Sequence, residues 1–172
     1  MLSDEQRQYM DLEAALTAGD LTQIRACFSD DAGFPDVHDR LTWTPLLELA
    51  INWSPLQTIE KLLESGASPN YEAADGYPSV YAALDSGRPD RLALVELLIG
   101  HGARVNDRGI NGHTPLHLAV AQRDGKAIEF LLAHGADPGL TTLIDDDLTP
   151  LDEAALMGNK EGAEMLRRLL KL

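Results

Sequence analysis

GHTPLHLAVAQRDGKAIEFLLAHGADP, residues 112–138, is the stretch of this sequence that decides the fold. Its Thr114-Pro115 pair is expected to begin a helix, because threonine can accept a hydrogen bond from a free helix N–H and proline suits a first turn. Leucine and alanine then recur at helical spacing on both sides of a tight turn at Asp124-Gly125. Gly135 can end the second helix in a left-handed conformation, and Pro138 prevents its continuation. The stretch therefore predicts two helices with a loop at each end.

Two phrases of this stretch recur along the chain in a fixed order. The opening phrase Thr-Pro-Leu occurs at residues 44–46, 114–116 and 149–151, with a degraded copy, Tyr-Pro-Ser, at 77–79. A closing phrase that begins with Gly-Ala occurs at residues 66–70, 102–106 and 135–138. Consecutive prolines of the opening phrase are 33, 37 and 35 residues apart. This period indicates a solenoid, in which neighbouring units stack to build a continuous core.

The repeated unit resembles the ankyrin repeat family, whose signature T-P-L-H-x-A is matched residue for residue at 114–119. The resemblance implies one all-α domain over residues 1–172, an α-solenoid of five helix-turn-helix repeats with short hairpin-like finger loops. It also implies that His117 is a structural residue that hydrogen-bonds between neighbouring loops. The expected repeats are roughly 1–35, 36–70, 71–106, 107–139 and 140–172, the first and last acting as caps.

Charge narrows the class of partner. The chain has a net charge of −14 and an isoelectric point near 4.5, which argues against binding to nucleic acid or to an anionic membrane surface. Residues 1–86 carry −11 of this charge and residues 87–172 carry −3. A basic protein partner would therefore favour the first half, although acidity also simply keeps a protein soluble.

Signals for membrane insertion, secretion and disulfide bonding indicate where the protein is expected to act. We expect no membrane-spanning segment, because no apolar run is long enough, and no signal peptide at the start of the sequence. The single cysteine, Cys27, cannot form an internal disulfide and lies in an apolar helical run that suits packing. We expect a cytoplasmic protein that is monomeric by itself.

Residue patterns that signal catalysis or metal binding are weak. His117 is explained by the resemblance, His101 and His134 precede the Gly-Ala phrase at equivalent places, and no two histidines share ligand spacing on one helix. The acidic run at residues 145–147 lacks the alternating oxygens of a hard-cation loop, which leaves an exposed loop or a contact for a basic partner. We therefore predict no enzyme, no cofactor and no metal.

The features that exceed the needs of the fold are aromatic side chains near acidic loops. In the ankyrin pattern, the fingers and the two helix positions after a small alanine line the concave face. In repeats two to five these helix positions are Asn52 and Trp53, Leu84 and Asp85, Ala121 and Gln122, and Leu156 and Met157. The aromatic residues could instead fill gaps left by irregular repeats, particularly Tyr77. The predicted partner-binding residues are Asp39, Trp43, Asn52, Trp53, Tyr71, Glu72, Asp75, Tyr77, Tyr81, Asp85, Arg108, Ile110, Asn111 and Gln122.

Three functions are compatible with this pattern. The first is a non-catalytic intracellular module that binds a partner protein on the concave face of the fingers and inner helices. The second is an acidic neutralising protein, of inhibitor or immunity type, for a basic enzyme such as a nuclease toxin. The third is a regulatory scaffold that links two partners.

Overall fold

The computed structural model describes residues 3–28, 32–71, 73, 76–143 and 147–171. Within these ranges the chain is helical, and its only extended pairing is an isolated bridge between His38 and Pro45. The predicted all-α solenoid is confirmed, whereas the repeat boundaries stay predictions. The elements are α1 (Asp4–Ala18), α2 (Leu21–Ala26), α3 (Leu46–Trp53), α4 (Leu56–Glu64), α5 (Ser79–Asp85), α6 (Arg91–Gly100), the 3-10 turn η1 (Ile110–Gly112), α7 (Pro115–Ala121), α8 (Gly125–Ala133), α9 (Pro150–Leu156) and α10 (Lys160–Leu170).

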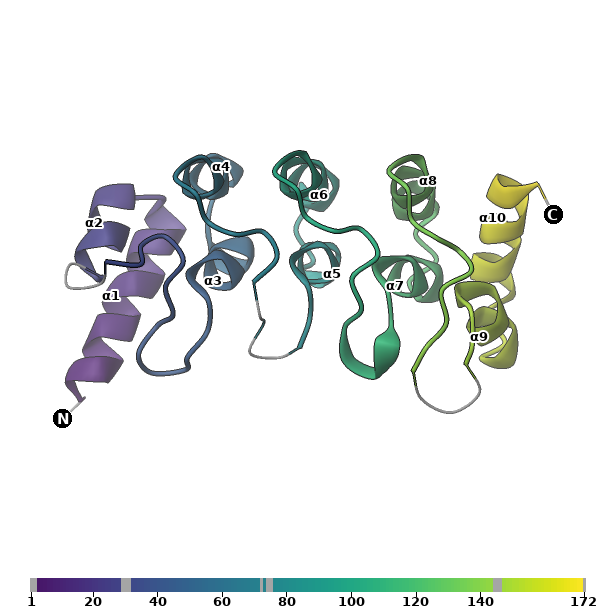
Figure 1. The fold of residues 1–172 in the computed structure, drawn as a ribbon, viewed down its shortest axis with the longest axis horizontal. Helices are drawn as coiled ribbons and strands as arrows, with labels where there is room; N and C mark the ends of the chain where they lie inside the picture. Colours follow the sequence, from purple (N-terminus) through teal and green to yellow (C-terminus); the bar gives the residue numbers. More distant parts are fainter. Residues whose placement is uncertain (1–2, 29–31, 72, 74–75, 144–146, 172) are drawn as a thin grey trace.

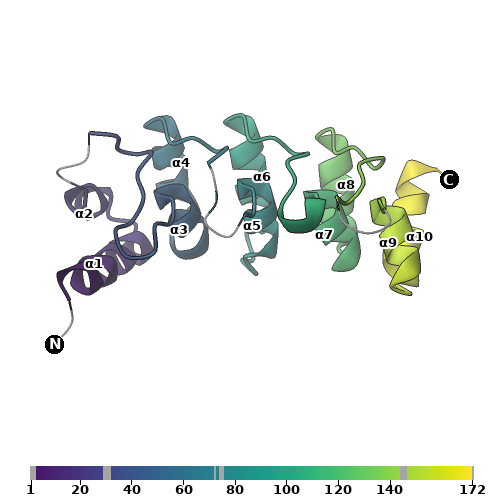
Figure 2. The same ribbon diagram turned by 60° about the horizontal axis from the view of Figure 1, so that its bottom comes forward.

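The helices form two rows (Figures 1 and 2). We call α1, α3, α5, α7 and α9 the inner row, and α2, α4, α6, α8 and α10 the outer row. Each inner helix packs on the outer helix that follows it and on the next inner helix. Leucine and isoleucine side chains fill the space between the rows, and the largest of them that are fully buried include Leu46, Ile59, Leu94, Leu116, Ile128 and Leu166.

The threonine-proline phrase begins α7 and α9 as predicted. Thr114 and Thr149 each form a capping box with the residue three positions on, and a proline occupies the first turn. The closing glycine is also confirmed, since Gly135, two residues after the last residue of α8, has a φ of 87°. These local signals therefore fix where the helices begin and end.

The copy at residues 44–46 behaves differently. Helix α3 begins at Leu46 without a side-chain cap. The backbone N–H of Thr44 donates instead to the Asp39 carboxylate at 2.9 Å, and its carbonyl accepts from the Asp39 N–H at 3.0 Å. Thr44 thus closes the loop before α3 rather than capping that helix.

Asparagine side chains join the loops that leave consecutive outer helices. Asn70 donates to the Gly102 carbonyl at 2.9 Å and accepts from the Arg104 N–H at 3.0 Å. Asn106 repeats this arrangement one unit further, with the Gly135 carbonyl at 3.0 Å and the Asp137 N–H at 2.9 Å. Each amide therefore ties one repeat to the next through a donor and an acceptor.

A second set of side-chain links lies along the edge of the stack opposite the fingers, where each inner helix turns into the outer helix that follows it. Arg88 donates to the carbonyls of Ile51 (3.2 Å) and Ser54 (2.6 Å) at the end of α3, while Asp90 holds its guanidinium at 2.8 Å. Asn159 performs the same task for α7, donating to the Val120 carbonyl at 2.8 Å. These contacts supply additional hydrogen-bond donors to carbonyls near the C-terminus of an inner helix.

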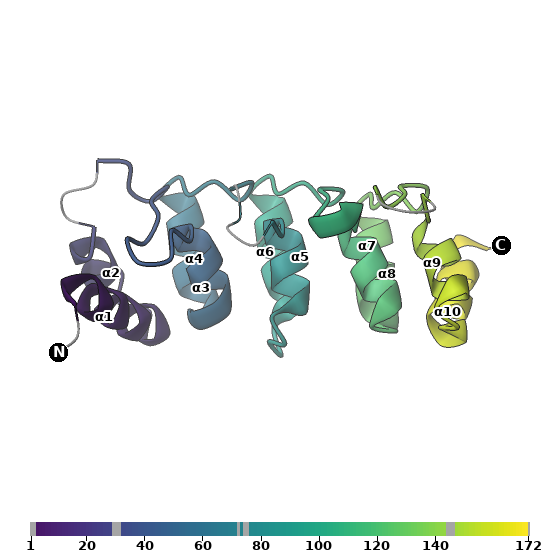
Figure 3. The ribbon, with the colours of Figure 1, turned by 90° about the horizontal axis from the view of Figure 1, so that it is seen from below.

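The fingers, loops that connect an outer helix to the next inner helix, lie along one edge of the stack (Figures 1 and 3). In the third finger (residues 106–113) the chain turns at Asn111 and Gly112, with φ of 61° and 81°. The Asn111 carbonyl accepts from the N–H of Leu143 in the fourth finger (residues 139–148) at 2.9 Å. Neighbouring fingers therefore contact each other directly.

Candidate partner-binding face

The exposed apolar side chains gather on one side of the solenoid. Among the described residues, every large hydrophobic side chain that is exposed lies in an inner helix, in a finger, or, for Met157, at the residue that directly follows α9. We call the surface formed by the fingers and the inner row the finger/inner-helix face; Figure 3 views it. Its exposed apolar residues are Met10, Leu41, Trp43, Trp53, Ile110, Leu143, Leu156 and Met157.

Charge divides between the two rows as well. The inner helices carry eight carboxylates and one cation, Arg7. The outer helices carry six carboxylates and seven cations. Over their described spans, α3, α5, α7 and α9 contain no lysine or arginine at all. The inner row is therefore acidic, while the outer row is close to neutral.

In the first finger (residues 34–43), one predicted contact residue is exposed and another is not. Trp43 is 71% exposed and stacks on His38, with ring centroids 5.2 Å apart. Asp39 is only 2% exposed, and its carboxylate accepts from the N–H groups of Leu41, Thr42 and Thr44 at 2.8–2.9 Å and from the Thr42 hydroxyl. The Asp39 carboxylate is therefore buried and committed to shaping this finger, and its contact with a partner stays a prediction.

Those hydrogen bonds also set the charge state of Asp39. Burial alone would raise the pKa of its carboxyl, but the hydrogen bonds from Thr42, Thr44 and Leu41 outweigh burial and lower that pKa below its ordinary value. The finger is therefore built around a carboxylate that stays ionised at neutral pH.

At the end of α3, the predicted pair Asn52 and Trp53 is exposed. Trp53 lines a narrow cleft together with Tyr9 of α1, so its ring lies partly over the joint between α1 and α3. The Asn52 amide donates to the Glu48 carbonyl at 3.2 Å within the helix. Both side chains remain accessible on the finger/inner-helix face.

The tyrosine cluster combines packing with exposure. Tyr77 and Tyr81 stack with ring centroids 4.6 Å apart and are half-buried. Tyr77 also lies against the backbone of Gly109, where an added Cβ would come within 2.9 Å of its ring. Tyr71 is packed against the core. The alternative that these aromatic residues fill space thus holds in part. The other two predicted residues of this region, Glu72 and Asp75, lie outside the described residues.

The remaining predicted residues lie over α5, α7 and the third finger. Gln122 donates to Asp85 at 3.0 Å, which bridges the exposed ends of α5 and α7. Arg108 donates to the Thr141 carbonyl at 2.7 Å, so its charge is directed toward the fourth finger. Ile110 and Asn111 are exposed at the tip of the third finger.

The list of predicted contact residues omitted several members of this face. Leu156 and Met157 are strongly exposed at the end of α9 and occupy the helix positions that the repeat pattern assigns to the concave surface. The contact between His113 and Glu153, at 2.7 Å, joins the third finger to α9 and follows no sequence signal that we recognise. The exposure of Met10 and Leu143 depends on how α1 and the fourth finger are placed.

His117 has the structural role that the resemblance implies. It is buried, its Nδ1 accepts from the Thr114 N–H at 3.2 Å, and its Nε2 contacts the Leu148 carbonyl before the next inner helix at 3.1 Å. Burial is the main reason that its pKa is lowered. This histidine thus joins two repeats in its neutral form.

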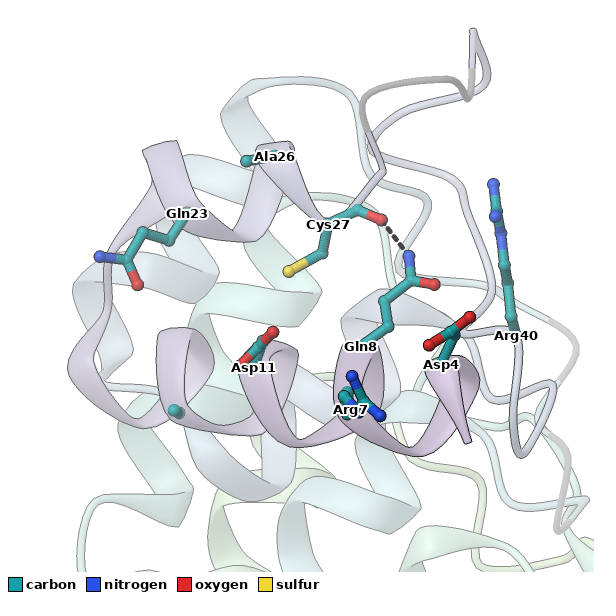
Figure 4. Close-up of a pocket in the computed structure, with 9 residues that line it drawn as sticks. Asp4, Arg7, Gln8, Asp11, Gln23, Ala26, Cys27 and Arg40 are labelled. Carbon is teal, nitrogen blue, oxygen red and sulfur yellow. Dashed lines mark hydrogen bonds between the residues drawn. The ribbon is translucent and has the colours of Figure 1, made fainter. Parts of the chain in front are cut away.

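A hollow of about 560 Å³ lies at the N-terminal end beside α1 and α2 (Figure 4). Asp4 and Asp11 line it together with Arg7 and Arg40, so opposite charges balance. Burial, aided by Asp11, raises the pKa of the Cys27 thiol, which makes this thiol a poor nucleophile at neutral pH. The hollow therefore offers no evident catalytic group.

The described residues contain no group of three or more histidine, cysteine, aspartate or glutamate side chains placed to hold a metal ion. Residues 145 and 146 of the acidic run lie outside the described part. None of the described helices is both long enough and apolar enough to cross a membrane.

Comparison with known proteins gives a consistent result. A family model for ankyrin repeats (3 copies) matches residues 80–170. The chain is 29% identical over 133 residues to a putative ankyrin repeat protein of fowlpox virus, covering 77% of this chain and 38% of that protein. It is 34% identical over 111 residues to a putative ankyrin repeat-containing protein of Treponema pallidum, covering 64% of this chain and 36% of that protein. For an ankyrin repeat-containing protein of Schizosaccharomyces pombe, identity is 35% over 106 residues, covering 62% and 47%. The chain spans less than half the length of each of these relatives.

Proposed function

This chain belongs to the ankyrin repeat family, and from that premise we propose that it is a non-catalytic module that binds another protein on its finger/inner-helix face. Ankyrin repeats generally act as protein–protein interaction modules. Three repeats are accounted for between residues 80 and 170, and we propose that the helix pairs α1–α2 and α3–α4 are two more.

The observation that carries the proposal is the one-sided distribution of exposed apolar side chains. Trp43, Trp53 and Met157 are accessible on the finger/inner-helix face, whereas the described outer helices expose no large hydrophobic side chain. Aromatic and methionine side chains are enriched in protein interfaces, where a few of them supply most of the binding energy. The face therefore has the side chains that a partner would bury.

The test uses the full chain and a partner first captured and identified by mass spectrometry. Trp43→Ser and Met157→Ser should each weaken binding about tenfold or more, because each removes an exposed apolar anchor. Glu60→Ser and Glu129→Ser, at exposed outer-row positions, serve as controls and should change affinity less than twofold. An equal loss in the outer-row variants would reject this placement, provided that circular dichroism shows all four proteins folded.

A neutralising protein for a basic enzyme is a second candidate, favoured by the acidic inner row. Opposite charge across an interface mainly accelerates association, and added salt screens that effect. Raising the salt concentration from 50 to 500 mM should therefore slow association with a basic partner by at least tenfold while changing dissociation little. Association that is insensitive to salt would remove this candidate and leave the general binding function in place.

A further inference from the structure

A groove of about 320 Å³ lies between α7 and α9. Its floor is apolar or backbone-like, formed by Val120, Ala121, Pro150 and Ala154. The two alanines leave space where larger side chains would fill it. The groove therefore has room for an inserted side chain with an apolar stem.

A carboxylate stands at one end of this groove. Glu153 lines it, and His113 of the third finger contacts its Oε1 at 2.7 Å. The side chain of Glu153 is 18% exposed, so it is held in place but still reached by solvent. Its second carboxylate oxygen receives no hydrogen bond from any described residue. This oxygen is therefore available to accept a hydrogen bond from outside.

The surroundings of the groove are acidic or polarisable. Burial is the main reason that the pKa of Tyr81 rises to about 12, and the charges of Tyr77, Asp85 and Glu153 add to that rise. Met157, which is 73% exposed, also lines the groove, four residues after Glu153 at the end of α9. A thioether beside a carboxylate forms a surface that suits a cation with a hydrocarbon stem.

The one cation that lines the groove is directed elsewhere. Arg123 donates to Asn159 at 3.1 Å and pairs with Glu161 at 3.7 Å. Arg123 lies two residues after the end of α7. When the repeats are aligned on Pro115 and Pro150, Arg123 lies five positions further along its repeat than Glu153 does, roughly 7 Å at the rise of a helix. Arg123 therefore does not neutralise the carboxylate end of the groove.

We propose that this groove is a docking pocket for one long cationic side chain, a lysine or an arginine, of the protein partner. The inference rests on the proposed function, since it identifies the chemistry of a partner for the finger/inner-helix face. The methylene stem lies on the floor between α7 and α9, and the charged group meets Glu153. The acidic inner row attracts a basic partner, and the pocket selects one of its side chains.

The experiment uses the full chain with ¹³C-labelled methionine methyl groups, titrated with N-acetyl-arginine amide or N-acetyl-lysine amide at constant ionic strength. The neutral probe N-acetyl-citrulline amide has the shape of arginine without its charge. The Met157 methyl signal should shift with a cationic probe at millimolar concentrations and at least fivefold less with citrulline. Met10 and Met165, which lie outside the groove, should not shift and serve as internal controls.

Matched variants then test the carboxylate. Glu153→Gln keeps an oxygen for His113 but removes the charge, and it should weaken the response of Met157 about tenfold. Glu129→Gln makes the same change on the exposed surface of α8 and should leave the response intact. No shift with either cationic probe, an equal shift with citrulline, or an unchanged response in Glu153→Gln would each overturn the pocket. Those outcomes leave the binding face itself to be judged by the Trp43 and Met157 variants with the captured partner.

Discussion

Replacing Asn159 with alanine should uncouple the last repeat from the one before it. Asn159 is buried; its Oδ1 accepts from the Gly162 N–H of α10 at 3.0 Å, and its Nδ2 donates to the Val120 carbonyl of α7 at 2.8 Å. One side chain thus caps a helix and crosses a repeat boundary at the same time. The substitution removes both interactions.

The magnitude follows from these two parts. Loss of an N-cap costs about 1 kcal/mol. The Val120 carbonyl keeps a hydrogen bond from the Arg123 N–H at 3.1 Å, so losing the Asn159 donor costs it one of two hydrogen bonds, a further ~0.5–1.5 kcal/mol. We therefore expect Asn159→Ala to lower the free energy of unfolding by about 1.5–2.5 kcal/mol, or to lower Tm by roughly 3–10 °C for a chain of this size.

Two variants separate the parts. Asp20→Ala removes a cap from α2, where the carboxylate accepts from the N–H groups of Thr22 and Gln23, and no described residue of another repeat shares it. It should cost only about 1 kcal/mol. Asn159→Asp keeps an oxygen for Gly162 but turns a carboxylate toward the Val120 carbonyl, and it should be as harmful as alanine.

Urea unfolding followed by circular dichroism gives the free energies, and hydrogen exchange shows where the loss falls. Because repeats are stabilised by their nearest neighbours, exchange should accelerate mainly in α9 and α10. If Asn159→Ala cost no more than Asp20→Ala, the bond across the repeat boundary would contribute nothing and the reasoning would fail.

Three further predictions concern single residues. His117 has a lowered pKa in the fold, so the native state favours its neutral form. Stability should therefore be full above the ordinary pKa of about 6.5 and fall as pH drops below it; urea midpoints at pH 7.5 and 5.0 should differ more for the natural chain than for His117→Leu. Asp39→Asn should cost about 1–3 kcal/mol because it removes a charged acceptor from the first finger, and faster hydrogen exchange confined to residues 37–46 would locate the loss. Gly112→Ala should cost about 1–3 kcal/mol, since φ is 81° and an added Cβ would come within 2.5 Å of the Leu143 nitrogen. Gly66→Ala, with φ of 103° but open space around it, should cost less in the same denaturation assay, and equal losses would mean that the contact between fingers is unimportant.

Much of the fold could be predicted because its signals are local. The capping box at Thr114, the left-handed glycine at Gly135 and the role of His117 each depend on residues within one repeat or its immediate neighbour. The capping box recurs at Thr149, although the copy of the phrase at Thr44 does not cap its helix. They could therefore be read from the sequence without knowledge of the whole stack.

The binding face was harder to predict because exposure depends on what other segments cover. Asp39 is an acidic residue in a finger, which suggests a contact residue, but the turn of the first finger encloses its carboxylate. Arg108 likewise donates to a carbonyl in a finger whose placement the sequence did not determine. Net charge by halves of the chain also gave no hint that carboxylates concentrate in the inner row, because each half contributes helices to both rows. A basic partner that favours the first half stays a prediction.

The asparagine amides that join consecutive loops make the repeats interchangeable at this boundary. Asn70 and Asn106 each bind the same two backbone groups, a glycine carbonyl and the N–H two residues later. Deleting residues 71–106 would leave Asn70 opposite the Gly135 carbonyl and the Asp137 N–H, the pair that Asn106 now holds. The hydrogen bonds at this boundary therefore do not depend on the number of repeats. The stack can become longer or shorter by whole repeats while the same pair of hydrogen bonds forms at the boundary.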